Sequence, residues 1–209
     1  MLTRRLIRVK VFKELFGKVA AGSDSLMQAE KELVASCNKT VELYCFLLQL
    51  PQALKKVALA RIEAGMSKFH PTPEEANPNR KFVENRFIEI LENDTPFGAM
   101  CQKKGLVWGD HDSFVKKLYA QIAGSEYFKE YMDNPERSLQ DDIALVKKIY
   151  EEELEDNEKL EEILEDMSLY WMDDLAYTIN VILKNMPAIA RKGMVDVPKA
   201  FLKEDDREY

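Results

Sequence analysis

Apolar residues recur at helical spacing along most of the chain, and this periodicity limits the fold more than any other feature of the sequence. No segment alternates apolar and polar residues for long enough to favour a strand. The 209 residues include only 8 glycines and 8 prolines, and three of the prolines fall between His70 and Asn79. The sequence therefore predicts an all-α fold, a multi-helix bundle without a sheet.

Prolines and capping residues divide the chain into four expected regions. Residues 1–69 are predicted to form a basic N-terminal helix and a pair of long helices that Pro51 separates. Residues 70–79 are predicted to form a proline-rich loop, and residues 187–209 a loop or tail. The acidic helical region 80–186 is expected to hold helices near residues 80–92, 95–103, 112–122, 125–132, 138–154, 156–166 and 173–186.

The first twenty residues are predicted to form one strongly basic helix, with six Lys and Arg residues against the single acid Glu14. At 100° per residue, Arg4, Arg5 and Arg8 share a stripe with the apolar residues of the next turns. These apolar residues are Val11, Phe12, Leu15, Phe16 and Val19. We expect the apolar part to dock on a core while the first turns present the arginines. Cations at the positive end of a helix dipole are unfavourable, so the arginines indicate an anionic partner, with phosphate the obvious candidate.

The charge of the chain is unevenly distributed. Residues 1–80 carry 13 Lys and Arg against 8 Asp and Glu, a formal charge of +5. Residues 81–209 carry 17 against 29, a formal charge of −12. An acidic region repels nucleic acid, so we expect any contact with a polyanion to be confined to the N-terminal part.

The order of residues in this helix matches a known pattern. Arg4-Arg5-x-x-Arg8-x-x-Val11-Phe12-x-x-Leu15-Phe16 resembles the arginine-rich first helix of the transcription antitermination factor NusB, N-utilisation substance protein B. The family pattern is Arg-Arg-x-Ala-Arg, then small or apolar residues and a Leu-Tyr pair. Thirteen positions align without a gap.

A second stretch, Ser168 to Asp174 with the helical residues that follow it, looks like a segment of the long form of NusB. The acidic residues Lys203 to Tyr209 resemble the joint that leads to the family's C-terminal half. The signature of that half, a Trp-led helix followed by an Ile-Asn-Glu helix, does not occur in these 209 residues. The resemblance therefore covers the N-terminal part of a long NusB, and we expect residues 187–209 to lead to an absent C-terminal half.

The resemblance implies a non-enzymatic, RNA-binding protein that acts in transcription termination and antitermination. Its expected partners are boxA-type RNA and the small-subunit ribosomal protein NusE within a transcription complex. Arg4, Arg5 and Arg8 match the RNA-contacting positions of the family one by one. Lys10 and Lys13 are further RNA-binding candidates, from their charge alone.

Other chemistry has little support in the sequence. Cys37, Cys45 and Cys101 form no CxxC pair, and the two histidines, His70 and His111, fit no common catalytic or metal site. The acids between Glu151 and Asp166 are predicted to form a solvated helix face, and Trp171 is predicted to be a core anchor whose following aspartates cap a helix. We expect no catalytic residue, metal, cofactor or small-molecule substrate.

No apolar run approaches the roughly 20 residues of a membrane-spanning helix, and the N-terminus lacks the features of a signal peptide. We expect a cytoplasmic protein without membrane contact. The competing hypothesis is a helical protein-interaction module that binds no RNA. In that case the basic helix docks against an acidic surface, and residues 151–174 of the same chain offer one.

Overall fold

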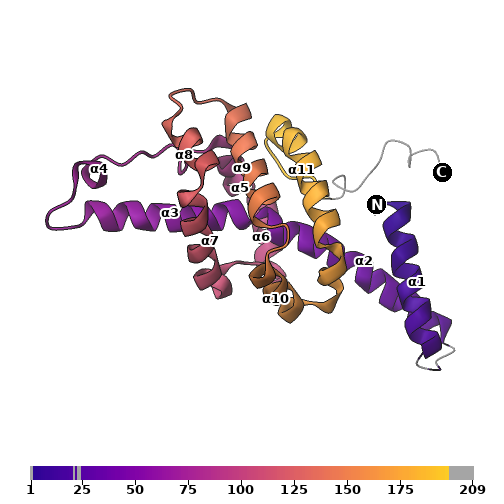
Figure 1. Ribbon diagram of the computed structural model, residues 1–209. Coiled ribbons are helices and arrows are strands. Elements are labelled where there is room, and N and C mark those ends of the chain that lie inside the picture. The colour runs from indigo at the N-terminus through magenta and orange to yellow at the C-terminus, as the bar shows by residue number, and fades with distance from the viewer. Residues whose placement is uncertain (1, 21, 23–24, 198–209) are drawn as a thin grey trace.

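The computed structural model describes residues 2–20, 22 and 25–197, and within them it is an all-α bundle of packed helices (Figure 1). No strand occurs among these residues, which confirms the predicted fold class. The N-terminal part contains α1 (Arg4–Ala20), α2 (Leu26–Leu48), α3 (Leu50–Met66) and α4 (Pro73–Ala76). The remainder contains α5 (Arg86–Asn93), α6 (Thr95–Lys103), η1 (Gly109–His111), α7 (Asp112–Gly124), α8 (Glu126–Asp133), α9 (Leu139–Glu153), α10 (Glu158–Met167), η2 (Leu169–Asp174) and α11 (Leu175–Lys192).

The junction of α2 and α3 forms the centre of the core. Leu43, Leu47, Leu50 and Leu54 are completely buried there, where α11 packs on α2, and α5 and α7 pack on α3 (Figure 1). Pro51 ends the first helix as the sequence predicts, because it has no N–H to donate to the carbonyl oxygen of Leu47. The hydroxyl of Tyr150 in α9 donates to that oxygen instead, at 2.7 Å. Burial raises the pKa of Tyr150 well above its ordinary value, so the donor stays protonated.

Three aromatic rings fix the elements that pack on the end of α2. Phe46 stacks between Trp108 and Trp171, with ring centroids 4.1 Å and 5.6 Å away. The indole N–H of Trp108 donates to the Phe46 carbonyl at 2.9 Å, and that of Trp171 donates to the Lys39 carbonyl at 2.8 Å. Trp171 is therefore the core anchor that the sequence predicts, and it holds η2 against α2.

Two predictions for residues 70–92 are wrong in detail. The proline-rich loop contains the single turn α4, which a reciprocal capping box of Thr72 and Glu75 stabilises. The next helix, α5, begins at Arg86 and not near Arg80, because the side chain of Asn85 accepts the Ile88 N–H as a helix cap.

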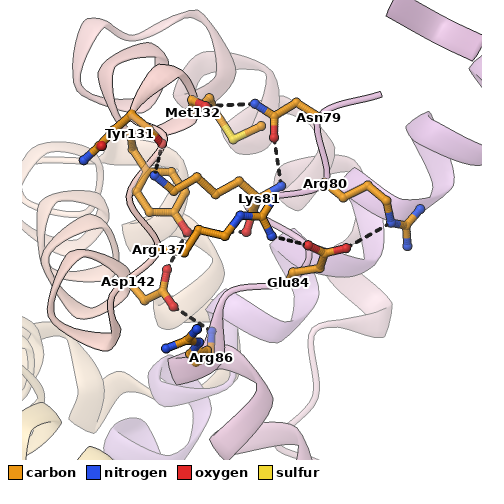
Figure 2. Close-up of polar contacts among 10 residues, drawn as sticks. Asn79, Arg80, Lys81, Glu84, Arg86, Tyr131, Met132, Arg137 and Asp142 are labelled. Carbon is orange, nitrogen blue, oxygen red and sulfur yellow. Dashed lines mark hydrogen bonds and ion pairs between the residues drawn. The ribbon is translucent and has the colours of Figure 1, made fainter. Parts of the chain in front are cut away.

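Residues 81–84 form turns, and the segment from Asn79 contacts the end of α8, as Figure 2 shows. The side-chain amide of Asn79 donates to the Met132 carbonyl at 2.8 Å, and the buried ammonium of Lys81 donates to the Asn134 carbonyl at 2.7 Å. A cation and an amide donor thus satisfy carbonyl groups at the end of α8. Asp142 completes the network by accepting hydrogen bonds from the Tyr131 hydroxyl and the Arg86 N–H.

The C-terminal helix is longer than predicted. The sequence places a loop or tail from residue 187, yet α11 continues through Pro187 to Lys192 and ends at Gly193 in the left-handed conformation. Met186 and Ile189 are buried on either side of the proline, and their packing offsets the hydrogen bond that proline removes. The remaining part of that prediction, residues 198–209, lies outside the described residues.

Replacing Tyr150 with Phe tests the junction of α2 and α3. The variant removes the donor to the Leu47 carbonyl while keeping the buried ring, so the free energy of unfolding should fall by about 1–3 kcal/mol. Tyr119→Phe is the matched control, because the Tyr119 hydroxyl has no hydrogen bond among the described residues and should lose less than about 0.5 kcal/mol. Urea denaturation measures both. Equal losses in the two variants would contradict the role of Tyr150.

Candidate nucleic-acid interface

Helix α1 packs alongside the first half of α2 as an arm that extends from the body of the protein (Figure 1). Its inner face is unusually polar. Lys10 is the one buried residue of the helix, at 6% exposure, and Glu14 and Lys18 are half-buried nearby. The Lys18 ammonium lies 3.1 Å from the Glu32 carboxylate of α2. Polar contacts therefore supply much of the attachment of α1 to α2.

The buried contact of α1 is an ion pair with η2. The Lys10 Nζ lies 2.7 Å from Asp174 Oδ2, and the two side chains are 6% and 2% exposed. Lys10 Nζ also donates to the Ser36 hydroxyl at 2.9 Å, and the Thr40 hydroxyl donates to the same Asp174 oxygen at 2.5 Å. A buried charge is tolerated when it is both paired and hydrogen-bonded, as this one is.

The structure places both site residues predicted from charge alone in ion pairs. Lys10 is enclosed by the protein, whereas Lys13 forms an ion pair with Asp173 in which its side chain stays 48% exposed. It also corrects the predicted role of the two aspartates. Asp174 occupies the N-cap position of α11, but its side chain makes no capping hydrogen bond because it is engaged with Lys10.

The opposite face of α1 presents the arginines. Arg5 and Arg8 are exposed, and among the described residues neither forms an ion pair. Together with Val9 and Phe12 they line a shallow, open hollow of about 480 Å³. Arg4 is exposed too, but it interacts with another group of the chain. Of the predicted RNA-binding residues, Arg5 and Arg8 are therefore the ones whose charge is available to a ligand at this surface.

The apolar stripe of α1 also faces outward, which contradicts the expectation that it docks on a core. Phe12, Phe16 and Val19 are 68%, 67% and 81% exposed. The rings of Phe12 and Phe16 stack on one another with centroids 6.1 Å apart. The cause is the placement of Lys10, which lies about 140–160° around the helix from Arg5, Arg8 and Phe12. Because Lys10 is held inside, the stripe that carries the arginines and aromatic rings is turned outward.

This face combines the two kinds of contact that single-stranded nucleic acid makes with proteins. Guanidinium groups bind phosphate oxygens in a charge-assisted, bidentate manner. Exposed aromatic rings provide surfaces on which unpaired bases stack. Arg8 and Phe12 are one helical turn apart and line the same hollow, so a phosphate and a neighbouring base can contact them together.

The remaining candidate regions are an acidic helix face and a groove between two helices. The acids of residues 151–166 are largely exposed as predicted, except that Glu153 is buried and accepts a hydrogen bond from Tyr127 at 2.7 Å. Among the described residues, no three His, Cys, Asp or Glu side chains are grouped to hold a metal ion. A groove of about 420 Å³ between α3 and α7 has an ion pair of Lys116 and Asp112 at its edge, and its lining contains no serine, cysteine or histidine.

Comparison of the chain with protein-family models, curated proteins and solved structures finds no match. Within the part of the chain that the structure describes, no helix is long and apolar enough to cross a membrane.

The outward orientation of the apolar stripe has a direct consequence for stability. Phe12→Ala and Phe16→Ala should each change the free energy of unfolding by less than about 0.5 kcal/mol, because these rings bury little surface. Phe87→Ala, the same change at a completely buried ring, should cost about 3–5 kcal/mol. Chemical denaturation compares the three. A loss above about 2 kcal/mol for Phe12→Ala would mean that the stripe is covered after all.

Proposed function

We propose that this chain is an RNA-binding transcription antitermination factor of the NusB type. The observation that carries the proposal is the outward face of α1, where Arg5 and Arg8 lie beside the exposed ring of Phe12. Its mechanism is binding without catalysis. The guanidinium groups displace counterions from phosphates and set the orientation of the RNA, and the aromatic rings receive unpaired bases.

The charge distribution supports single-stranded RNA bound at the arm. Residues 81–209 carry a formal charge of −12, so nucleic acid that approaches the body of the protein is repelled. Two further cations of the arm, Lys10 and Lys13, form ion pairs with Asp174 and Asp173. Arg5 and Arg8 form no ion pair among the described residues, so attraction is concentrated at their exposed side chains.

The resemblance to NusB adds the finer parts of the proposal. It points to boxA-type RNA as the ligand, to NusE as the protein partner and to the cytoplasm as the place of action. Arg4, Arg5 and Arg8 align with the RNA-contacting positions of the family. Of these, Arg5 and Arg8 carry most weight, because they line the same hollow as Phe12.

A second candidate function is a protein-interaction module without RNA binding. It is favoured by the exposed apolar residues of the arm, which include Phe12 and Phe16 of α1 and Leu26 and Met27 at the start of α2. Leu26 and Met27 are 76% and 69% exposed. Exposed apolar surface of this kind is typical of contacts with other proteins. RNA binding ranks first because the same surface also presents the guanidinium groups of Arg5 and Arg8, which form no ion pair among the described residues.

The test is a titration of a fluorescently labelled single-stranded boxA-type RNA at several salt concentrations. We expect affinity to fall with salt, with a slope of about −0.7 for each phosphate neutralised. Arg5→Glu with Arg8→Glu should weaken binding by at least about tenfold and reduce the steepness of the slope by about 1.4, the contribution of two phosphate contacts. The double variant should remain folded, because both side chains are exposed.

The matched control is Lys56→Glu with Lys103→Glu, which changes the net charge equally at exposed sites in α3 and α6. This control should bind RNA almost as well as the unchanged protein. Absence of binding at low salt would overturn the RNA proposal and favour the interaction module. An equal loss in both double variants would show that overall charge, and not the face of α1, governs binding.

A further inference from the structure

We infer that Asp174, acting through Lys10, is a positioning residue for the RNA-binding face of α1. The inference rests on the proposed function, since it concerns how that face is presented. Asp174 lies 164 positions after Lys10 in the chain, at the end of η2, and its recorded contacts are with the inner side of α1 and with α2. Asp174 therefore affects RNA binding by setting the orientation of α1, and not by contacting RNA.

The geometry around the Lys10 ammonium determines where α1 lies. Asp174 in η2 and Ser36 in α2 accept hydrogen bonds from Lys10 Nζ at 2.7 Å and 2.9 Å. Thr40, one turn after Ser36, donates to the same Asp174 oxygen and fixes the carboxylate. Two elements far apart in sequence therefore hold one ammonium group through directional bonds, and these bonds define both the position and the rotation of the helix.

Apolar packing restrains the rotation of α1 only weakly. Leu6 and Ile7 are partly buried against the core, whereas Phe12, Phe16 and Val19 contact mainly solvent. Suppose that α1 turned about its own axis by about 100°, the angle between consecutive residues. A different side of the helix would then face α2, and the arginines would leave the outer surface. The ion pair opposes this rotation, because moving Lys10 outward leaves Asp174 buried without its cation.

The element that carries Asp174 is itself rigidly placed. Trp171, three residues earlier, stacks on Phe46 and donates to the Lys39 carbonyl of α2. The carboxylate is thus fixed to the core of the protein by a buried ring and by the Thr40 hydroxyl. Because its support is rigid, the carboxylate of Asp174 can fix the orientation of α1, although the apolar side of α1 is exposed to solvent.

A double variant, Lys10→Met with Asp174→Asn, separates positioning from folding. Each single change leaves a buried group without its partner, whereas the double change removes both charges together and retains two side chains of similar size. The thioether that replaces the Lys10 ammonium donates no hydrogen bond, so α1 should leave its place on α2 more often, and the detached helix should open transiently. Lys13→Met with Asp173→Asn is the matched control, because it makes the same chemical changes in the exposed ion pair between the same two elements.

The first readout is amide hydrogen exchange in α1, which needs no RNA. In the Lys10→Met, Asp174→Asn variant, amides of α1 should exchange at least about tenfold faster, while those of α9 should be unchanged. The control variant should exchange like the original protein. Unchanged protection of α1 in the double variant would overturn the inference, whatever the result with RNA.

The second readout is RNA affinity by the salt titration described above. If α1 holds the binding orientation only about a tenth of the time, the apparent Kd should rise about tenfold although Arg5 and Arg8 are intact. The control should lose much less, although it removes the same lysine charge. Unchanged affinity despite faster exchange, or equal loss in both variants, would overturn the inference. Failure of the original protein to bind RNA, with α1 loosened only in the double variant, would refute the proposed function and leave the structural role of Asp174 standing.

Discussion

The buried ion pair between Lys10 and Asp174 is the constraint on which the presentation of the N-terminal arm depends. It places a charged residue where most amphipathic helices place leucine, and it turns the apolar and arginine-bearing stripe of α1 toward solvent. A pair of this kind contributes little net stability compared with an apolar contact, but it is costly to break and strongly directional. Orientation is therefore its main effect in this protein, and orientation is what a binding face requires.

Local rules predicted much of the fold. The helices predicted near residues 95–103, 125–132 and 138–154 are present, with Asp94, Ser125 and Ser138 as their N-caps, and Pro51 separates the two long helices. The predictions that failed depend on distant contacts. Residues 79–84 leave the helix because they bind the end of α8, and α11 passes through Pro187 because the residues around it are buried. Propensity and periodicity contain no information about such contacts.

The candidate site, like the fold, could be predicted where local sequence decides and not where distant contacts decide. The sequence singles out the basic helix, and its arginines are exposed. It cannot distinguish Lys10 from Arg8 as a free cation, because the partner of Lys10 lies 164 residues away. Nor could it place the stripe of Phe12 and Phe16 outside, since a stripe at helical spacing normally faces a core. The Asp173-Asp174 pair directly after the Trp171 turn offered the one sequence signal, because two acids near a buried aromatic residue can accept a cation from another element.

The central claim is that the stripe of α1 is uncovered and is the surface that RNA contacts. Hydroxyl-radical footprinting of the whole chain, with and without single-stranded RNA, tests it most directly. The account predicts that Phe12 and Phe16 are readily oxidised in the free protein and are protected when RNA binds, while exposed Phe69 reacts equally in both samples. Resistance of Phe12 and Phe16 to oxidation in the free protein, or unchanged reactivity when RNA is bound, would contradict it.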